Sequence, residues 1–316
     1  MVGTVERGFP PGPWVLVLGM HRSGTSALTG ALSRLGLVLP DAADLVAGRY
    51  DNPVHYESQA LTDLDDAILR ALGGSWSAPP VLAASWERSA AVLGVMGDGP
   101  RAARRAFPHG GPMLWKDPRQ CLLLPLWRSI LPPPVVVVFL WRAPLAVARS
   151  LGTRQGFSPS LGLALWERYN REALAGMAGQ AVYVMRYEEL LADPQGSVTD
   201  VAQWLVSDGH VPMLVDDDAI GHAAATVVER PERHADEGEH EGEIPEVIRE
   251  TVATLTGLTG PHDRMADAPV GRPPSWMGDV IAQRRDYEDL YAHYMRYVKW
   301  RRRIPFVGRR ARPGHS

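Results

Sequence analysis

Two groups of residues in this sequence have the types and spacing needed to bind phosphate. In the first, the apolar run Trp14 to Leu18 ends in a polar, glycine-containing turn, and a helical pattern follows. Backbone N–H groups at the start of such a helix point at one spot, where the helix dipole favours an anion. The residues predicted to line this first phosphate site are His21, Arg22, Ser23, Gly24, Thr25 and Ser26.

This turn differs from the loop of nucleotide triphosphatases, which reads G-x-x-x-x-G-K-[ST]. Gly19 and Gly24 have the required separation, but Thr25 occupies the position of the lysine. The cation, Arg22, lies inside the loop instead. Because the triphosphatase lysine reaches the β- and γ-phosphates, its replacement favours a nucleotide donor other than ATP.

Arg142 and Ser150 form the second group. Arg142 follows the β-branched run Val135 to Leu140, and Ser150 lies eight positions later, two turns along a helix that Pro144 opens. A guanidinium and a hydroxyl presented in this way can hold one phosphate. Two anion sites at one sheet edge suit a nucleotide phosphorylated at both its 5′ and 3′ positions. In a P-loop kinase the corresponding strand would end in an Asp that holds Mg²⁺. Arg142 at this position therefore disfavours a kinase and predicts a site without metal.

These residues resemble those of sulfotransferases that use 3′-phosphoadenosine 5′-phosphosulfate (PAPS), in particular the bacterial branch. The turn at 21–26 is similar to the family's 5′-phosphosulfate loop, and Arg142-Ala143-Pro144 with Ser150 is similar to its 3′-phosphate signature. Segment 186–194 is similar to its Tyr-Glu-Asp/Glu-Leu…Asp-Pro segment. The resemblance covers about residues 14–205.

The resemblance implies a P-loop-like α/β fold and transfer of a sulfuryl group from PAPS to a hydroxyl or, less favoured, an amine. It implies that Arg22 replaces the loop's catalytic cation, that Ser23 to Ser26 hold the 5′-phosphate, and that Tyr187 lies near the adenine. The Arg-Lys-Gly segment of the eukaryotic cytosolic subgroup has no clean match. Arg230 or Arg233 is a candidate to complete the 3′-phosphate site.

The general base is expected in segment 51–57, which resembles the Asn-Pro-x-Gly-Tyr-Trp-Glu segment of bacterial relatives. Glu57 is the first choice; the alternative is a solvated carboxylate at a helix N-terminus. His55 is the second choice because imidazole titrates near neutral pH.

A further segment, Lys116-Asp117-Pro118-Arg119, resembles the Lys-Asp-Pro-Arg segment of bacterial sulfotransferases. Lys116 and Arg119 would place positive charge beside the sulfuryl group or an anionic acceptor. The alternative is a structural ion pair between Asp117 and Arg119 at a turn.

Composition limits the other classes of function. The chain has 316 residues and a formal net charge of −3, which argues against a general nucleic-acid binder. Its single cysteine, Cys121, leaves no intrachain disulfide and no cysteine zinc site. Because no secretory signal and no apolar run of about 20 residues is present, we expect a soluble, cytoplasmic protein.

Alternating strand and helix patterns predict a doubly wound α/β fold with a central parallel sheet. Its sites should lie beyond the carboxyl ends of the strands. The expected strands are 14–18, 113–115, 135–140 and 181–185, and the expected helices are 24–35, 57–72, 85–94, 144–152, 160–177 and 276–299. The expected organisation is a loose leader over 1–13, one domain over 14–300 that includes an acceptor-side insertion at 40–111 and a mobile acidic loop at 229–243, and a basic tail at 301–316.

The sequence leaves the acceptor open among small molecules, glycans and lipids, and it leaves the oligomeric state open. Two other functions stay open as well: an ATP-dependent small-molecule kinase on the same scaffold, and a nucleotide-binding relative without catalysis. The basic tail is expected to be a solvated end, with contact to an anionic membrane surface as the alternative.

Overall fold

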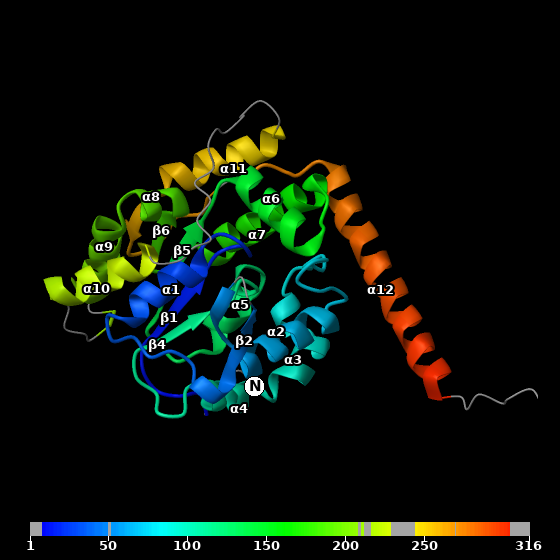
Figure 1. The fold of residues 1–316 in the computed structure, drawn as a ribbon, viewed down its shortest axis with the longest axis horizontal. Coiled ribbons are helices and arrows are strands. Elements are labelled where there is room, and N and C mark those ends of the chain that lie inside the picture. Colours follow the sequence, from blue (N-terminus) through cyan, green and yellow to red (C-terminus); the bar gives the residue numbers. More distant parts are fainter. Residues whose placement is uncertain are drawn as a thin grey trace, which may run out of the picture.

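A mostly parallel sheet of five strands lies at the centre of the computed structural model, which describes residues 8–49, 52–207, 210–211, 216–228, 244–268 and 270–303 (Figure 1). The strands in spatial order are β4 (Met113–Lys116), β1 (Trp14–Leu18), β5 (Val135–Trp141), β6 (Val182–Arg186) and β7 (Gly260–His262). The first four are parallel, and β7 pairs antiparallel with β6. The predicted α/β fold class is confirmed, with an antiparallel edge strand that the sequence did not indicate.

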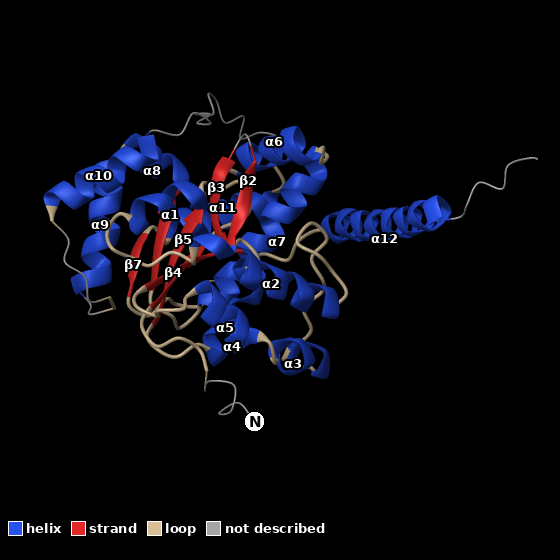
Figure 2. Ribbon diagram, turned by 60° about the horizontal axis from the view of Figure 1, so that its bottom comes forward, coloured by secondary structure: helices blue, strands red, loops and turns tan. Residues whose placement is uncertain are grey.

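Helices cover both faces of this sheet (Figure 2). Alternate side chains of β1 enter separate cores, because successive residues of a strand point to opposite faces: Trp14 and Leu16 join one, Val15 and Val17 the other. The helices that contribute to the first core include α5 (Gln120–Ile130), α7 (Pro159–Met177) and α11 (Glu246–Gly257). The helices that contribute to the second include α1 (Thr25–Ser33), α9 (Pro194–Ser207) and α10 (Asp217–Val228).

Residues 40–111 contain a hairpin that the sequence did not predict. β2 (Leu45–Arg49) pairs antiparallel with β3 (Asn52–Ser58), and the expected helix from Glu57 begins only at Gln59. Ser58 ends the strand and caps α2 (Gln59–Ala71), because its Oγ accepts a hydrogen bond from the N–H of Leu61 at 3.1 Å. Glu57 therefore lies on a strand, and the expectation of a helix N-terminus at this position was wrong.

The remaining helices near this region are short. The expected helix at 85–94 consists of the 3₁₀ turn Trp86–Arg88 followed by α3 (Ala90–Met96), and another 3₁₀ turn spans Ala42–Asp44. The other helices are α4 (Gly99–Ala106), α6 (Pro144–Gln155) and α8 (Tyr187–Ala192).

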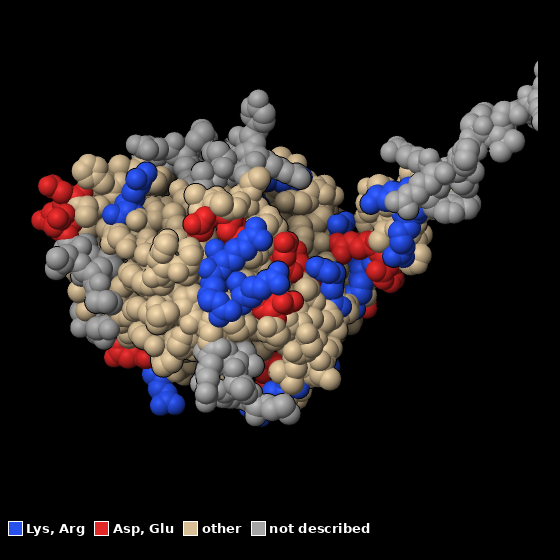
Figure 3. All heavy atoms as spheres, turned by 90° about the horizontal axis from the view of Figure 1, so that it is seen from below, with Lys and Arg blue, Asp and Glu red and all other residues tan. Residues whose placement is uncertain are grey.

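The C-terminal helix α12 (Ser275–Arg303) packs against the body along its first half only. Met277 and Ile281, in its first two turns, are buried in the core, and contacts with the body continue to Glu288, which accepts from Ser75 and Ser77. Beyond Glu288 the helix runs away from the body (Figures 1 and 2). Acidic and basic side chains both occur on its projecting part (Figure 3). The helical backbone also continues to Arg303, three residues into the expected tail.

At the other end, the leader is not loose throughout. Phe9 is buried, and its ring packs edge-on against Trp14 and Trp127 at 6.5 and 6.4 Å. Residues 1–7, the acidic segment 229–243 with Arg230 and Arg233, and residues 304–316 lie outside the described residues. Within the part of the chain that is described, no helix has the length and apolar character that crossing a membrane requires.

Candidate active site

The turn between β1 and α1 has a strained backbone. Arg22 and Gly24 both have positive φ angles, 74° and 85°. For Arg22 this left-handed conformation costs about 1–3 kcal/mol, a cost that is concentrated at functional sites. Gly24 has a second constraint, because a Cβ atom here would overlap the ring of Tyr187. The turn therefore requires glycine at position 24.

The two groups of residues predicted to bind phosphate meet at this turn. Arg22 donates a hydrogen bond from Nε to Ser150 Oγ at 2.9 Å, and Arg142 donates from Nη1 to the carbonyl oxygen of Arg22 at 3.3 Å. The guanidinium of Arg142 also lies over the ring of Tyr187, 5.1 Å from its centroid. Four residues from three separate segments thus surround the carboxyl ends of β1, β5 and β6.

Hydrogen bonds from neighbouring elements hold Arg142 in place. Its carbonyl oxygen accepts from Trp166 Nε1 on α7 at 2.8 Å. The next N–H, of Ala143, donates to Glu188 Oε1 at 3.0 Å, and Glu188 also accepts from Arg186. The loop after β5 is therefore tied to both α7 and α8.

Two polar atoms of the β1–α1 turn are buried and have no hydrogen-bond partner within the described part of the chain: Ser23 Oγ and His21 Nε2. A buried polar atom without a partner costs about 1–3 kcal/mol. A ligand that forms hydrogen bonds with these two atoms would remove this cost. The main-chain N–H groups at the start of α1 also suit an anion. The residues present therefore fit a bound phosphate group.

His21 is uncharged at neutral pH. Burial lowers the pKa of its imidazole well below the usual value, and the nearby cations Arg119, Lys116 and Arg22 lower it further. Its ring lies 4.5 Å from that of Trp76 and 5.7 Å from that of Tyr169, measured between centroids. The turn thus combines a neutral imidazole, packed against two aromatic rings, with several cations near it.

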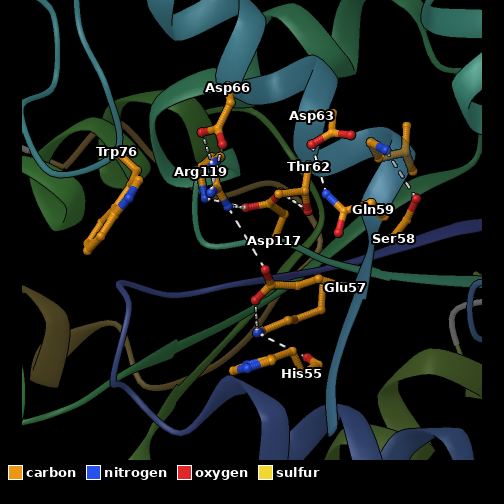
Figure 4. A network of polar contacts seen from close by, with 12 residues as sticks. His55, Glu57, Ser58, Gln59, Thr62, Asp63, Asp66, Trp76, Asp117 and Arg119 are labelled. Atoms are coloured by element: carbon orange, nitrogen blue, oxygen red, sulfur yellow. Dashed lines mark hydrogen bonds and ion pairs between the residues drawn. The ribbon is translucent and has the colours of Figure 1, made fainter. Parts of the chain in front are cut away.

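The third predicted segment forms a buried charge cluster beside this turn (Figure 4). Lys116, at the end of β4, pairs with Glu57 and donates to the carbonyl oxygen of His55 at 3.2 Å. Arg119 Nη1 lies 3.9 Å from Glu57 Oε2. Ser26 Oγ, on α1, donates to the same His55 carbonyl at 3.4 Å. Glu57 and Lys116 are thus brought to the β1–α1 turn, and His55 contributes its main chain.

Arg119 also forms the ion pair that was the alternative interpretation of its segment. Its Nη1 lies 3.1 Å from Asp117 Oδ1, and its Nε donates to Asp66 Oδ1 at 2.6 Å. Burial disfavours the charge of Arg119, but Asp117, Asp66 and Glu57 outweigh burial and raise its pKa. Arg119 therefore stays a cation that its neighbours hold in place.

Several residues of this site were not identified from the sequence. Asp66 and Thr62 of α2 bind Arg119 and Asp117 respectively, and Asp65 accepts a hydrogen bond from Trp127. Trp76, in the segment before α3, packs against His21. The one available signal was the run Asp63-Leu64-Asp65-Asp66, where acidic residues fall on the apolar face of a helical pattern.

Two cavities lie in the described part of the chain, and one of them is lined by Ala143 and Pro144, next to Arg142. One, of about 340 Å³, is bounded by β6, α8 and α9 and includes Glu189, Asp193 and Asp200. The other, of about 250 Å³, lies between the start of α6 and α11. Neither is lined by Arg22 or Glu57. Among the described residues, no group of three His, Cys, Asp or Glu side chains could hold a metal ion.

Comparison with known proteins finds similarity at the level of structure. No family model and no curated protein matches the sequence. The sulfotransferase domain of the olefin synthase from Synechococcus PCC 7002 is 16% identical, with 87% of this chain and 96% of that one covered and a TM-score of 0.42. A sulfotransferase domain from the curacin biosynthetic pathway is 13% identical, with coverage of 87% and 98% and a TM-score of 0.40. Likeness at this level concerns the fold; the chemistry follows from the chain's own residues.

Proposed function

We propose that this chain is a PAPS-dependent sulfotransferase that acts on a hydroxyl, or less favourably an amine, of a small-molecule, glycan or lipid acceptor. The observation that carries the proposal is the convergence of Arg22, Arg142, Ser150 and Tyr187 at one edge of the sheet. Guanidinium groups bind phosphate through paired donors, and the edge is where ligands of open α/β sheets bind.

The same residues suggest how the donor nucleotide would be held. Ser23, with its buried hydroxyl, and the main chain of Gly24, Thr25 and Ser26 would bind the 5′-phosphate at the start of α1. Arg142 and Ser150 would bind the 3′-phosphate. Tyr187, which already lies beneath the guanidinium of Arg142, would contact the adenine. These roles match the residues' places in the family resemblance.

The acceptor would meet the part of the chain formed by residues 40–111. This region supplies Glu57 on β3, which pairs with Lys116, and Trp76, which packs against His21 of the β1–α1 turn. It also supplies Asp66 on α2, which binds Arg119. We also predict that the reaction takes place in the cytoplasm.

The reaction forms a bond between the acceptor oxygen and sulfur and breaks the bond between sulfur and the bridging oxygen of the 5′-phosphate. Glu57 takes the acceptor's proton, and the products are a sulfate ester and adenosine 3′,5′-bisphosphate. Arg22 and Lys116 offset the negative charge that grows on the leaving phosphate oxygen. Since Glu57 is neutralised as it takes the proton, its pairing with Lys116 weakens and the ammonium becomes available to that oxygen. Because these side-chain cations, and no metal ion, offset the charge on the leaving oxygen, EDTA should leave the rate unchanged.

A thermal-shift comparison tests the donor. We expect adenosine 3′,5′-bisphosphate to raise the melting temperature selectively, because a ligand that binds the native state stabilises it. A selective rise with ADP and Mg²⁺ would instead favour the kinase and overturn the proposal. Intact-mass screening of acceptors with PAPS then tests transfer: a gain of one sulfuryl group supports the enzyme, and binding without any turnover supports a non-catalytic relative.

A further inference from the structure

A cavity of about 340 Å³ between β6, α8 and α9 carries chemistry that the proposed function does not use. Figure 1 shows these three elements together, on the side of the molecule opposite α12. The volume falls in the range of about 300–1,000 Å³ in which proteins bind small molecules. Arg22, Arg142 and Tyr187 of the proposed donor site do not line this cavity. It is therefore a separate candidate site.

The wall of this cavity is acidic. Glu189, Asp193 and Asp200 line it, and no lysine, arginine or histidine is among the described residues that do so. Glu189 and Asp193 are four positions apart, a spacing that places two side chains on one face of a helix. Asp200 has the same spacing from Gly196, which also lines the cavity. The sequence thus directs carboxylates from both α8 and α9 to one place.

The three carboxylates differ in what they bind. Asp193 has a structural role, because its Oδ1 accepts a hydrogen bond from the N–H of Gly196 at 2.9 Å at the start of α9. Within the described part of the chain, the side chains of Glu189 and Asp200 form no ion pair and no hydrogen bond. These two carboxylates are therefore available to a cationic ligand.

Tyr183 on β6 also lacks a polar partner in this cavity. The residue is only 8% exposed, and its ring packs against that of Trp204 with centroids 5.7 Å apart. Its hydroxyl has no hydrogen-bond partner among the described residues, although buried polar groups normally have one. Burial, together with the charges of Asp200 and Glu189, raises the pKa of Tyr183 to about 12. The neutral hydroxyl thus lies near both carboxylates and can accept a hydrogen bond from a ligand.

The arrangement of these groups selects the class of cation. No three His, Cys, Asp or Glu side chains of the described chain lie close enough together to hold one metal ion, so the carboxylates do not converge on a single point charge. The apolar residues Val184, Met185 and Ala192 line the same cavity. Separate negative charges in a partly apolar cavity fit a ligand in which methylene groups join two or more ammonium groups.

We propose that this cavity binds a linear alkyl diamine or polyamine. One ammonium group would pair with Asp200 and donate a hydrogen bond to Tyr183 Oη, and a second would pair with Glu189. Because ion pairs that are partly exposed contribute little each, we expect a dissociation constant on the order of 10⁻⁴ M for spermidine. The proposal does not depend on the proposed activity, because its readout is the binding of the amine alone.

Calorimetric titration of the full chain with spermidine and with 1,4-diaminobutane tests the site. We expect saturable binding, and about tenfold weaker binding by E189Q/D200N. The matched control D286N/D289N removes two exposed carboxylates from α12, on the other side of the molecule, and should bind like wild type (Figure 1). Equal losses in the two double variants, or no saturable binding by wild type up to about 10 mM amine, would overturn the proposal. Circular dichroism melting verifies that the variants are folded.

A second variant tests the hydroxyl. Y183F keeps the ring that packs against Trp204 and removes only the oxygen, so its affinity for spermidine should fall about three- to tenfold. Y294F, which removes the hydroxyl of an exposed tyrosine on α12, is the control and should bind like wild type. Undiminished binding by Y183F would show that the amine does not occupy this cavity as proposed.

Titrations with other cations separate the alternatives. Butylamine, with a single ammonium group, should bind more weakly than 1,4-diaminobutane, because it can pair with only one of the two carboxylates. Saturable binding of Ca²⁺ that E189Q/D200N abolishes, without binding of the diamine, would assign the cavity to a metal ion instead. The peptide acetyl-Lys-Ala-Ala-Lys-amide presents the same ammonium groups on a polypeptide. If it bound more tightly than spermidine, the cavity would be assigned to lysine side chains of a protein partner, and the small-amine proposal would be wrong.

Discussion

Arg22 Nε donates a hydrogen bond to Ser150 Oγ at 2.9 Å, across 128 positions of the chain. The contact joins the turn after β1 to the second turn of α6. It means that the loop cation is positioned by the residue that would bind the 3′-phosphate. A donor with phosphate at both ribose positions would therefore engage a site whose two halves are already linked.

Replacement of Ser150 by alanine tests this linkage. A neutral hydrogen bond contributes about 0.5–1.5 kcal/mol, so we expect S150A to bind adenosine 3′,5′-bisphosphate about three- to tenfold more weakly. Affinity for adenosine 5′-monophosphate, which lacks the 3′-phosphate, should fall less. Calorimetric titration measures both. T153A is the control, since Thr153 lies on the same helix and bonds only to the carbonyl oxygen of Arg149 by its hydroxyl; equal losses in the two variants would contradict the linkage.

Gly24 gives a second prediction, on stability. G24A and G36A both place a side chain at a positive φ, 85° and 89°, but only at Gly24 would the new Cβ meet another residue, the ring of Tyr187. Both should lose the ~1–2 kcal/mol of a left-handed L-residue, and G24A should lose about 1–3 kcal/mol more through overpacking. Urea denaturation measures the free energies of unfolding. If the overlap is the cause, G24A should cost no more than G36A when both are measured in a Y187A background.

The role of Glu57 gives a third prediction, on rate. E57Q keeps the shape and the acceptor oxygen beside Lys116 but cannot take a proton, so sulfuryl transfer should slow by about 10²–10⁴-fold. Affinity for adenosine 3′,5′-bisphosphate should change little. D63N is the matched control: Asp63 is a nearby carboxylate on α2, exposed and bonded to Gln59. Full turnover by E57Q would assign the base to another residue and leave Glu57 a structural partner of Lys116.

How much of this arrangement the sequence predicts depends on the range of the interactions. The strand at Trp14–Leu18, the turn after it and the strand at Val135–Trp141 were predicted because continuous apolar runs and turn residues are local signals. The hairpin that carries Glu57 was missed, since its strands pair only with each other and Tyr56 adopts a positive φ of 58°. The pairing of Arg119 with Asp66 crosses 53 positions and has no local pattern at all.

His21 gives a fourth prediction, on pH. Its pKa is lowered in the folded state, by burial and by Arg119, Lys116 and Arg22, whereas an unfolded histidine titrates near 6.5. Below that pH the histidine binds a proton in the unfolded chain but not in the folded protein. The free energy of unfolding therefore falls as pH falls, by at most about 1.4 kcal/mol per pH unit. Urea denaturation should show that the free energy of unfolding decreases less between pH 7.5 and pH 5.5 in H21N than in wild type. The exposed His293 is the control, and an H293N variant with the same flattening would contradict this assignment.

Asp65 should have the opposite pH dependence. Burial and the neighbouring Asp117 raise its pKa well above the usual value, against the hydrogen bond from Trp127, and its Oδ2 has no hydrogen-bond partner in the described structure. The carboxylates of Asp65, Asp66 and Asp117 lie near the guanidinium of Arg119, which also lies 3.9 Å from Glu57. Protonation of Asp65 leaves that guanidinium paired with Asp66 and Asp117.

A raised folded-state pKa stabilises the protein fully only below the unfolded value near 3.9, and this contribution is lost as pH rises through the folded value. In D65N the amide cannot ionise. The free energy of unfolding of D65N, relative to that of wild type, should therefore increase between pH 4 and pH 7. D63N, with an exposed carboxylate on the same helix, should show no such gain. Chemical denaturation across this range decides the point. A difference between D65N and wild type that is constant with pH would mean that Asp65 ionises in the folded protein as it does in the unfolded chain.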